Sequence, residues 1–349
     1  MQTPETLGQA VRRINAAFYE RGWTDGLPIV PPTPDGVREM LAATGRGGEE
    51  LIAEIPPNMG RATVEKIAVN ALMAGCLPDD MPVILAAVKA LAEERVGIQA
   101  IQGTTDVHAP LLIVNGPIAR QLDINSGPNC FGQGWRANAT IGRAIRLIML
   151  NLGGAAPGKI DKSTFGHPGK YTYCVAENEE ASPWEPLHVE RGFQAADSAV
   201  TIFPCEAPHQ ISDHYNRSAI GIMRTICDAI ATVGTTPLYR AGEALLVISP
   251  EHAEAFRSDG WRKRDVKMHV FEHARVPVGR MKYQGDWDAS VATFTPRWVD
   301  LDDPHARMPI LRQPDDLLVI VAGARAGRFS LFMPGWGFPT GSATVKIER

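Results

Sequence analysis

The sequence predicts an α/β protein in which a mixed sheet is flanked by helices, and it allows two similar halves. Three short aliphatic runs indicate this fold class: residues 111–114, 245–248 and 317–320. They are apolar throughout rather than alternately apolar and polar, as in strands buried on both faces. Amphipathic helical segments separate them, which is typical of α/β folds. With 349 residues, 44% of them hydrophobic, the chain can bury a large core.

Residues 1–60 are predicted to form an N-terminal helix and an extended, proline-rich arm. The helix is expected over residues 4–21, where apolar side chains recur at helical spacing: Leu7, Val11, Ile14 and Phe18. Residues 22–33 hold too many prolines for a helix interior and are expected to lie extended across the body. Asp25 precedes a glycine there, and it serves either as a turn residue or as a site residue.

Residues 61–198 are predicted to form a first α/β half. Its helices at 62–76 and 81–94 are joined by a short proline-containing link, which indicates an αα-hairpin. The strand at 111–114 is followed by a helix at about 137–152. Residues 155–198 then form a long irregular loop, and loops of this length inside a compact domain are commonly functional. We therefore expect a binding loop in this region.

Residues 199–349 are predicted to form a second α/β half of similar design. Strands and helices are expected over these ranges: 199–203, 218–233, 244–248, a helix from Pro250, 265–274 and 317–321. The helix from Pro250 follows the preference of proline for the first helical position.

A glycine-rich loop before the helix at 137–152 suggests an anion site. Its backbone N–H groups lie at a helix N-terminus, where the helix dipole favours negative charge. The same residues also fit an ordinary loop and a helix with a basic exposed face. The predicted substrate-binding residues are Asn115, Gly132, Gly134, Arg136, Asn138 and Arg143.

Three groups of residues are candidates for catalysis. In the first, Cys205 lies near His209, with Asp213 and His214 just beyond. An imidazole can lower a thiol pKa and activate it as a nucleophile, and the same residue types can also bind a transition metal. The remaining alternative is a strand end with a buried cysteine and solvated histidines.

The second group is an acidic loop, and the third surrounds a histidine before the strand at 111–114. The acidic loop contains Glu177, Glu179, Glu180 and Glu185, with Trp184 and His188. Grouped carboxylates beside a histidine suit acid–base catalysis or a hard metal, or they are simply solvated. In the third group, His108 would act as an acid or base while arginines hold a carboxylate or phosphate, unless it is a core or turn residue.

Composition excludes several classes of function. The net charge of −4, without a basic stripe, argues against a nucleic-acid partner, and no apolar run is long enough for a membrane span. Five scattered cysteines without a Cys-x-x-Cys pair fit reduced thiols in a cytoplasm. The sequence contains no phosphate loop, GxSxG elbow, HExxH or flavin signature. A divalent metal remains open as a cofactor.

Five strings of the sequence carry a resemblance to a known family: residues 22–33 (GWTDGLPIVPPT), 63–71 (TVEKIAVNA), 114–117 (VNGP), 136–143 (RANATIGR) and 176–180 (AENEE). Together they resemble the C-terminal portion of UGSC-type (seleno)proteins. That family is named for a selenocysteine-Gly-Ser-Cys motif in a separate N-terminal segment. No Cys-Gly-Ser-Cys string occurs here. The resemblance therefore transfers neither a redox role nor a site residue.

The function expected from the residues is an enzyme that acts on a small anionic organic molecule. A lyase or hydrolase that breaks a carbon–heteroatom bond fits best, with His108 or His209 moving protons and Glu177 or Glu180 assisting. We expect it to be cytoplasmic and a homo-oligomer. One alternative is an auxiliary, non-catalytic subunit that docks a redox partner protein of a thiol/selenol system. Another alternative is a metal-dependent enzyme.

Overall fold

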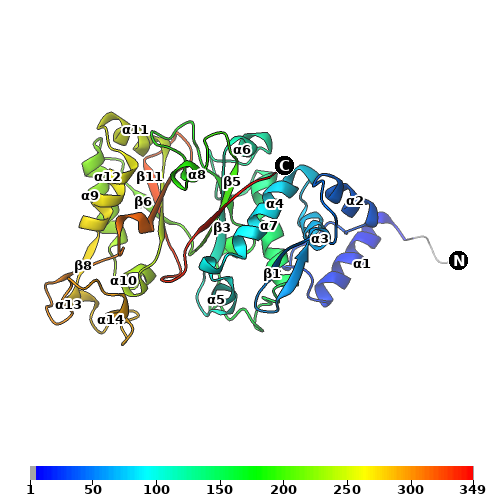
Figure 1. Cartoon of the computed structure of the whole chain (residues 1–349), viewed down its shortest axis with the longest axis horizontal. Coiled ribbons are helices and arrows are strands. Elements are labelled where there is room, and N and C mark those ends of the chain that lie inside the picture. Colours follow the sequence, from blue (N-terminus) through cyan, green and yellow to red (C-terminus); the bar gives the residue numbers. More distant parts are fainter. Residues whose placement is uncertain (1–4, 349) are drawn as a thin grey trace.

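The computed structural model, which describes residues 5–348, contains two four-stranded mixed sheets packed face to face, with helices on the outer face of each (Figure 1). The α/β class with mixed sheets and flanking helices is confirmed. Both faces of each sheet are apolar and buried. One face packs on helices and the other on the opposite sheet. The core between the sheets includes Leu111, Ile113, Phe203, Leu245, Val247, Leu318, Ile320 and Met333.

The first sheet has the strand order β12-β5-β3-β4. Its strands are β3 (Ala109–Asn115), β4 (Cys174–Ala176), β5 (Ala199–Cys205) and β12 (Ala343–Lys346). Strand β4 is parallel to β3, whereas β5 and β12 run antiparallel to their neighbours. Three helices share a core with the outer face: α3 (Val64–Ala74), α4 (Met81–Leu91) and α7 (Arg136–Asn151).

The second sheet has the strand order β10-β7-β11-β6 and repeats the same pattern of directions. Its strands are β6 (His209–Ser212), β7 (Ala244–Ile248), β10 (Leu317–Val321) and β11 (Phe329–Pro334). Its outer face packs against α9 (Ala219–Ile230), α11 (Pro250–Ser258) and α12 (Lys263–His273). Similar halves, which the three aliphatic runs allowed, are therefore visible in the matching order and direction of the strands.

The two halves exchange strands across the interface. The chain crosses from β5 in the first sheet to β6 in the second, and later from β11 back to β12. The two crossings meet, because Cys205 forms an isolated bridge with Gly335 and the Glu206 N–H donates to the Pro334 carbonyl over 3.0 Å. The expected boundary at residue 198 consequently does not separate the sheets, since β5 pairs with β3.

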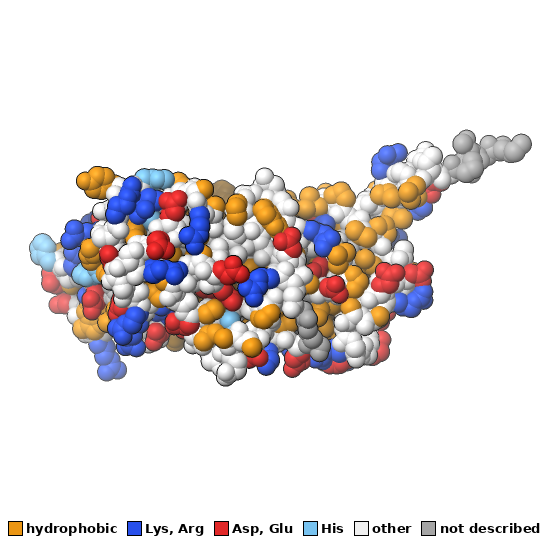
Figure 2. All heavy atoms as spheres, turned by 90° about the horizontal axis from the view of Figure 1, so that it is seen from above, with side chains coloured by type: hydrophobic (Ala, Val, Ile, Leu, Met, Phe, Trp, Pro, Cys, Tyr) orange, Lys and Arg blue, Asp and Glu red, His pale blue; other side chains and the backbone are white. Residues whose placement is uncertain are grey.

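The N-terminal part wraps the first half. Helix α1 (Leu7–Glu20) begins after the capping residue Thr6 and is followed by α2 (Pro34–Ala42) and a hairpin of β1 (Leu51–Ile55) and β2 (Gly60–Thr63). The predicted start of the first helix at Pro4 lies outside the described residues. Only Ile14 and Phe18 of its apolar stripe pack on the core, whereas Leu7 stays 82% exposed. Figure 2 shows hydrophobic side chains gathered at this end of the molecule.

Short elements complete the chain. They are α5 (Ile98–Gly103), α6 (Pro117–Gln121), α8 (Leu187–Glu190), α10 (Thr236–Arg240), β8 (Arg275–Pro277), α13 (Val278–Met281), α14 (Val291–Phe294) and β9 (Arg307–Pro309). The loop expected to be irregular, 155–198, contains β4, α8 and a 3₁₀ turn at Pro168–Lys170. Within residues 5–348, no helix is both long enough and apolar enough to cross a membrane.

Candidate anion-binding site

The anion site predicted at the start of α7 does not assemble, because two of its residues have structural partners. Both Nε and one terminal nitrogen of Arg143 donate to the Asp25 carboxylate, over 2.8 and 2.9 Å. This ion pair fastens the N-terminal arm to α7. Asn138 is buried, accepts from the Asn125 N–H over 2.7 Å and donates to the Cys174 carbonyl over 3.1 Å. It holds the preceding loop in place and is not free to bind a substrate.

The remaining predicted binding residues also lie apart from one another. Gly132 lines a hollow of about 440 Å³ that faces the loop after β10, and Arg136 is exposed and does not line it. Gly134 is exposed as well. Asn115 ends β3 and contacts Glu177 instead. The glycine-rich loop therefore shapes a surface hollow without bringing a cationic side chain into it.

A larger hollow of about 600 Å³ lies beside the C-terminal half of α7, and it contains a different arginine. Its volume is in the range of small-molecule sites, about 300–1,000 Å³. Arg146 lines it, one turn beyond Arg143. Its other walls come from the N-terminal arm, the last turn of α7 and the long loop: Thr24, Asp25, Leu150, Ala155, Pro157, Gly158, Asp161, Ser163, Phe165, Gly166, His167, Pro168, Lys170 and Tyr171.

Arg146 is the cation in this hollow whose charge is not paired. It makes no hydrogen bond or ion pair with any residue between 5 and 348, and burial lowers its pKa, opposed by the charges of Asp161 and Asp25. Both of those carboxylates are engaged elsewhere. Asp25 binds Arg143, and Lys170 Nζ lies 2.9 and 2.8 Å from the two oxygens of Asp161. The guanidinium is thus left available for an anion, which it can bind through two parallel hydrogen bonds.

His167 adds a neutral imidazole to the same hollow. Its Nδ1 accepts a hydrogen bond from the Gly169 N–H over 3.1 Å, so in the neutral ring the proton resides on Nε2. That Nε2 is buried without a hydrogen-bond partner among the described residues. Burial, followed by the charge of Lys170, lowers the pKa of His167 to about 4. At neutral pH the ring is therefore uncharged.

Behind His167, a partly buried acid–base cluster of His108, Asp106 and Glu206 lies where the two strand crossings meet. His108 is buried, with Nδ1 3.5 Å from an Asp106 carboxylate oxygen and its ring edge-on to Trp336 at 5.3 Å. Neither ring nitrogen has a hydrogen-bond partner within the described chain. Burial raises the pKa of Glu206, and the charge of His108 opposes that shift. The Thr236 hydroxyl donates to Glu206 over 3.0 Å.

The group around Cys205 is not an active thiol site. Cys205 is fully buried between the sheets, and burial raises the pKa of its thiol well above the ordinary range, so a thiolate is disfavoured. His209 lies exposed on β6 of the other sheet, and Asp213 accepts from Asn216 and Thr225. The chain crosses to the other sheet between Cys205 at the end of β5 and His209 at the start of β6, so the two residues belong to different sheets. In the described part of the chain, no three His, Cys, Asp or Glu residues are grouped as metal ligands.

The acidic loop is divided between a buried and an exposed part. Asn115 donates to Glu177 over 2.7 Å and the Leu187 N–H donates over 2.8 Å, and burial raises the pKa of Glu177 to about 7. Glu180, by contrast, is 78% exposed and pairs with Arg120. Glu177 stands past the far end of β3 from His108, roughly 20 Å away at about 3.3 Å per residue. These two predicted catalytic residues therefore do not share a site.

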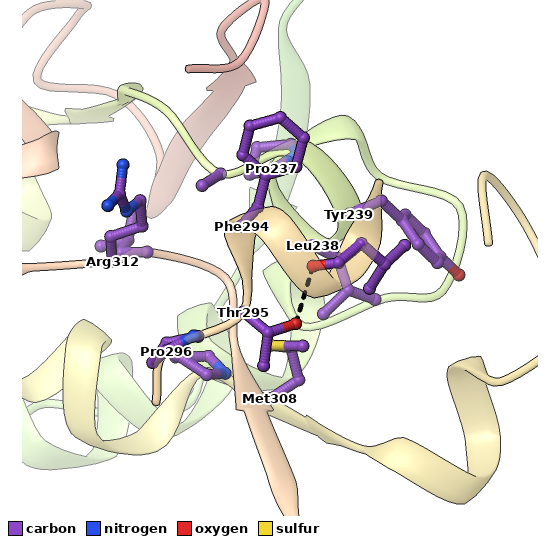
Figure 3. Close-up of a pocket in the computed structure, with 12 residues that line it drawn as sticks. Pro237, Leu238, Tyr239, Phe294, Thr295, Pro296, Met308 and Arg312 are labelled. Carbon is purple, nitrogen blue, oxygen red and sulfur yellow. Dashed lines mark hydrogen bonds between the residues drawn. The ribbon is translucent and has the colours of Figure 1, made fainter. Parts of the chain in front are cut away.

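Figure 3 shows a third hollow, between α10, α14 and β9, which is too small for a substrate. Its volume is about 10 Å³, scarcely the space of one water molecule. Thr295 donates to the Val291 carbonyl in its wall over 2.8 Å, and the Arg312 guanidinium lies 4.4 Å from the centre of the Phe338 ring. These contacts are structural.

A scan against protein-family models and a search of curated proteins find no match to this chain. The resemblance to UGSC-type proteins stays a prediction. The case for a function therefore depends on the side chains around the Arg146 hollow. Arg146, His167, Lys170 and Glu206 were not among the predicted site residues. One signal of Arg146 is visible in the sequence, since it interrupts the aliphatic run Ile145, Leu147, Ile148.

Proposed function

We propose that this protein is an enzyme that acts on a small anionic organic molecule by acid–base chemistry, with Arg146 binding the anionic group. The observation that carries the proposal is the unpaired guanidinium of Arg146 in a hollow whose other charges are already neutralised. A partly buried cation without a counter-ion costs free energy, and a carboxylate or phosphate of the substrate would remove that cost. The same interaction would fix the orientation of the substrate.

The acid–base chemistry would come from the side chains next to Arg146. His167 contributes a neutral imidazole ring to the wall of the hollow, with its Nε2 buried away from it. Burial lowers the pKa of Lys170, with Asp161 opposing, so its ammonium group is a stronger acid than an exposed lysine. Protonation of a leaving group is the step that a lyase or hydrolase needs to break a carbon–heteroatom bond. His108 and Glu206 lie behind His167 and add two titratable groups to this region.

Binding measurements on charge variants test this proposal. Arg146→Gln should weaken the binding of acetate and inorganic phosphate, measured by calorimetry, at least about tenfold, because a hydrogen bond to a charged group contributes about 1.5–3 kcal/mol. The matched control is Arg120→Gln, which removes an exposed arginine paired with Glu180. Equal anion affinity in the two variants, with both still folded by circular dichroism, would contradict the proposal.

The expectations of a cytoplasmic location and of self-association belong to the same proposal. Helix α1 supports self-association, because none of its residues Leu7–Glu20 is buried although its sequence is amphipathic. Light scattering after chromatography, on wild type and on Leu7→Ser, distinguishes an oligomer that uses this helix from a monomer.

A further inference from the structure

The Arg146 hollow has a second, apolar component that a site for a small inorganic anion would not need. Phe165 and Tyr171 both line it, and they are 90% and 50% exposed. Leu150, Ala155, Pro157 and Pro168 add aliphatic surface to its walls. A phenylalanine ring gains free energy when it leaves water, so an exposed ring at the wall of a hollow is surface that a ligand can cover.

The segment that presents Phe165 is held on both sides. Before it, the Thr164 N–H donates to the Thr105 carbonyl over 2.8 Å, and the Thr164 hydroxyl donates to the same carbonyl over 3.1 Å. After it, the Gly166 N–H donates to the Ser163 hydroxyl over 3.1 Å, in a turn that requires a φ of +66° at this glycine. The exposed Phe165 ring therefore belongs to a turn that hydrogen bonds fix on both sides.

We infer that the substrate class is a small carboxylate with an aromatic body, whose carboxylate binds Arg146 and whose ring packs on Phe165 and Tyr171. This inference depends on the proposed function, since it assigns an aromatic ring to the anionic molecule that Arg146 is proposed to bind. Cationic, neutral polar and apolar side chains share the walls of this one hollow. That mixture is the combination that small-molecule sites use for affinity and orientation.

Affinity ratios test the substrate class separately from the anion site. Phenylacetate and acetate are titrated by calorimetry into wild type, Phe165→Ala, Arg146→Gln and a matched control, Tyr215→Ala. Tyr215 is also 90% exposed but does not line the hollow. We expect wild type to prefer phenylacetate at least tenfold. Phe165→Ala should lose about three- to tenfold of that preference, the usual contribution of one aromatic pair, without a change in acetate affinity.

The outcomes separate the two claims. Equal affinities of wild type for phenylacetate and acetate, or an unchanged preference in Phe165→Ala, would overturn the aromatic substrate class and leave the anion site standing. An Arg146→Gln variant that binds both compounds as wild type does would overturn the proposed function itself. If neither compound binds wild type, both claims fail.

Discussion

Removal of one partner of the ion pair between Asp25 and Arg143 is expected to be strongly destabilising. Both side chains are largely buried, with 5% and 13% of their surface exposed, and the carboxylate binds the guanidinium through two hydrogen bonds. Asp25→Ala would leave Arg143 buried without a counter-ion. Loss of one partner of a buried pair costs about 3–5 kcal/mol. The arm should also loosen, because Asp25 joins residues 22–33 to α7.

Calorimetry and proteolysis together measure this effect. At about 2–4 °C per kcal/mol for a large domain, Asp25→Ala should lower Tm by about 6 °C or more. Limited proteolysis should then cut first within residues 21–33. The control is Asp35→Ala, whose carboxylate pairs with Arg38 at the surface and is 79% exposed; exposed pairs contribute about 0–1 kcal/mol. If Asp25→Ala were no less stable than Asp35→Ala, the structural role assigned to Arg143 would be wrong.

Two further predictions concern Glu177 and Cys205. Burial raises the pKa of Glu177 from 4.5 to about 7, so its stabilising contribution is complete below pH 4.5 and is lost as the pH rises through 7. Urea unfolding should show wild type losing about 3 kcal/mol relative to Glu177→Gln across this range, and parallel pH profiles would contradict the assignment. In the native protein at pH 8, Cys205 should resist iodoacetamide until the chain is unfolded, because burial raises its thiol pKa. Rapid alkylation of Cys205 in the native protein, detected by mass spectrometry, would contradict this prediction and show that the thiol is reactive.

The local elements were predictable because their signals are local. The aliphatic runs of β3, β7 and β10 and the amphipathic stripe of α7 mark buried strands and a packed helix in the sequence itself. The second sheet was not predicted. Strand β6 has a mostly exposed pattern, and β12 consists of only four residues. No local pattern indicates that the chain crosses between sheets after Cys205 and again after β11.

The site shows the same division between local and distant information. The sequence predicted cations on α7, but which of them has an ion-pair partner depends on Asp25, which lies 118 positions from Arg143 and pairs with it. Asn115 and Glu177 were both proposed as site residues, and their contact spans 62 positions. His209 was placed beside Cys205 because they are close in sequence. Pairing of β6 with β11 moves it into the other sheet.

The most direct test of the central claim is to locate a bound anion crystallographically. Crystals soaked with 4-bromobenzoate give an anomalous bromine signal, which fixes the position and direction of the ligand. The structure predicts one carboxylate within hydrogen-bond distance of the Arg146 guanidinium, with the ring on the side of Phe165, and no such density in Arg146→Gln crystals. Occupied bromine sites elsewhere, with the Arg146 hollow empty in the wild type, would contradict the account.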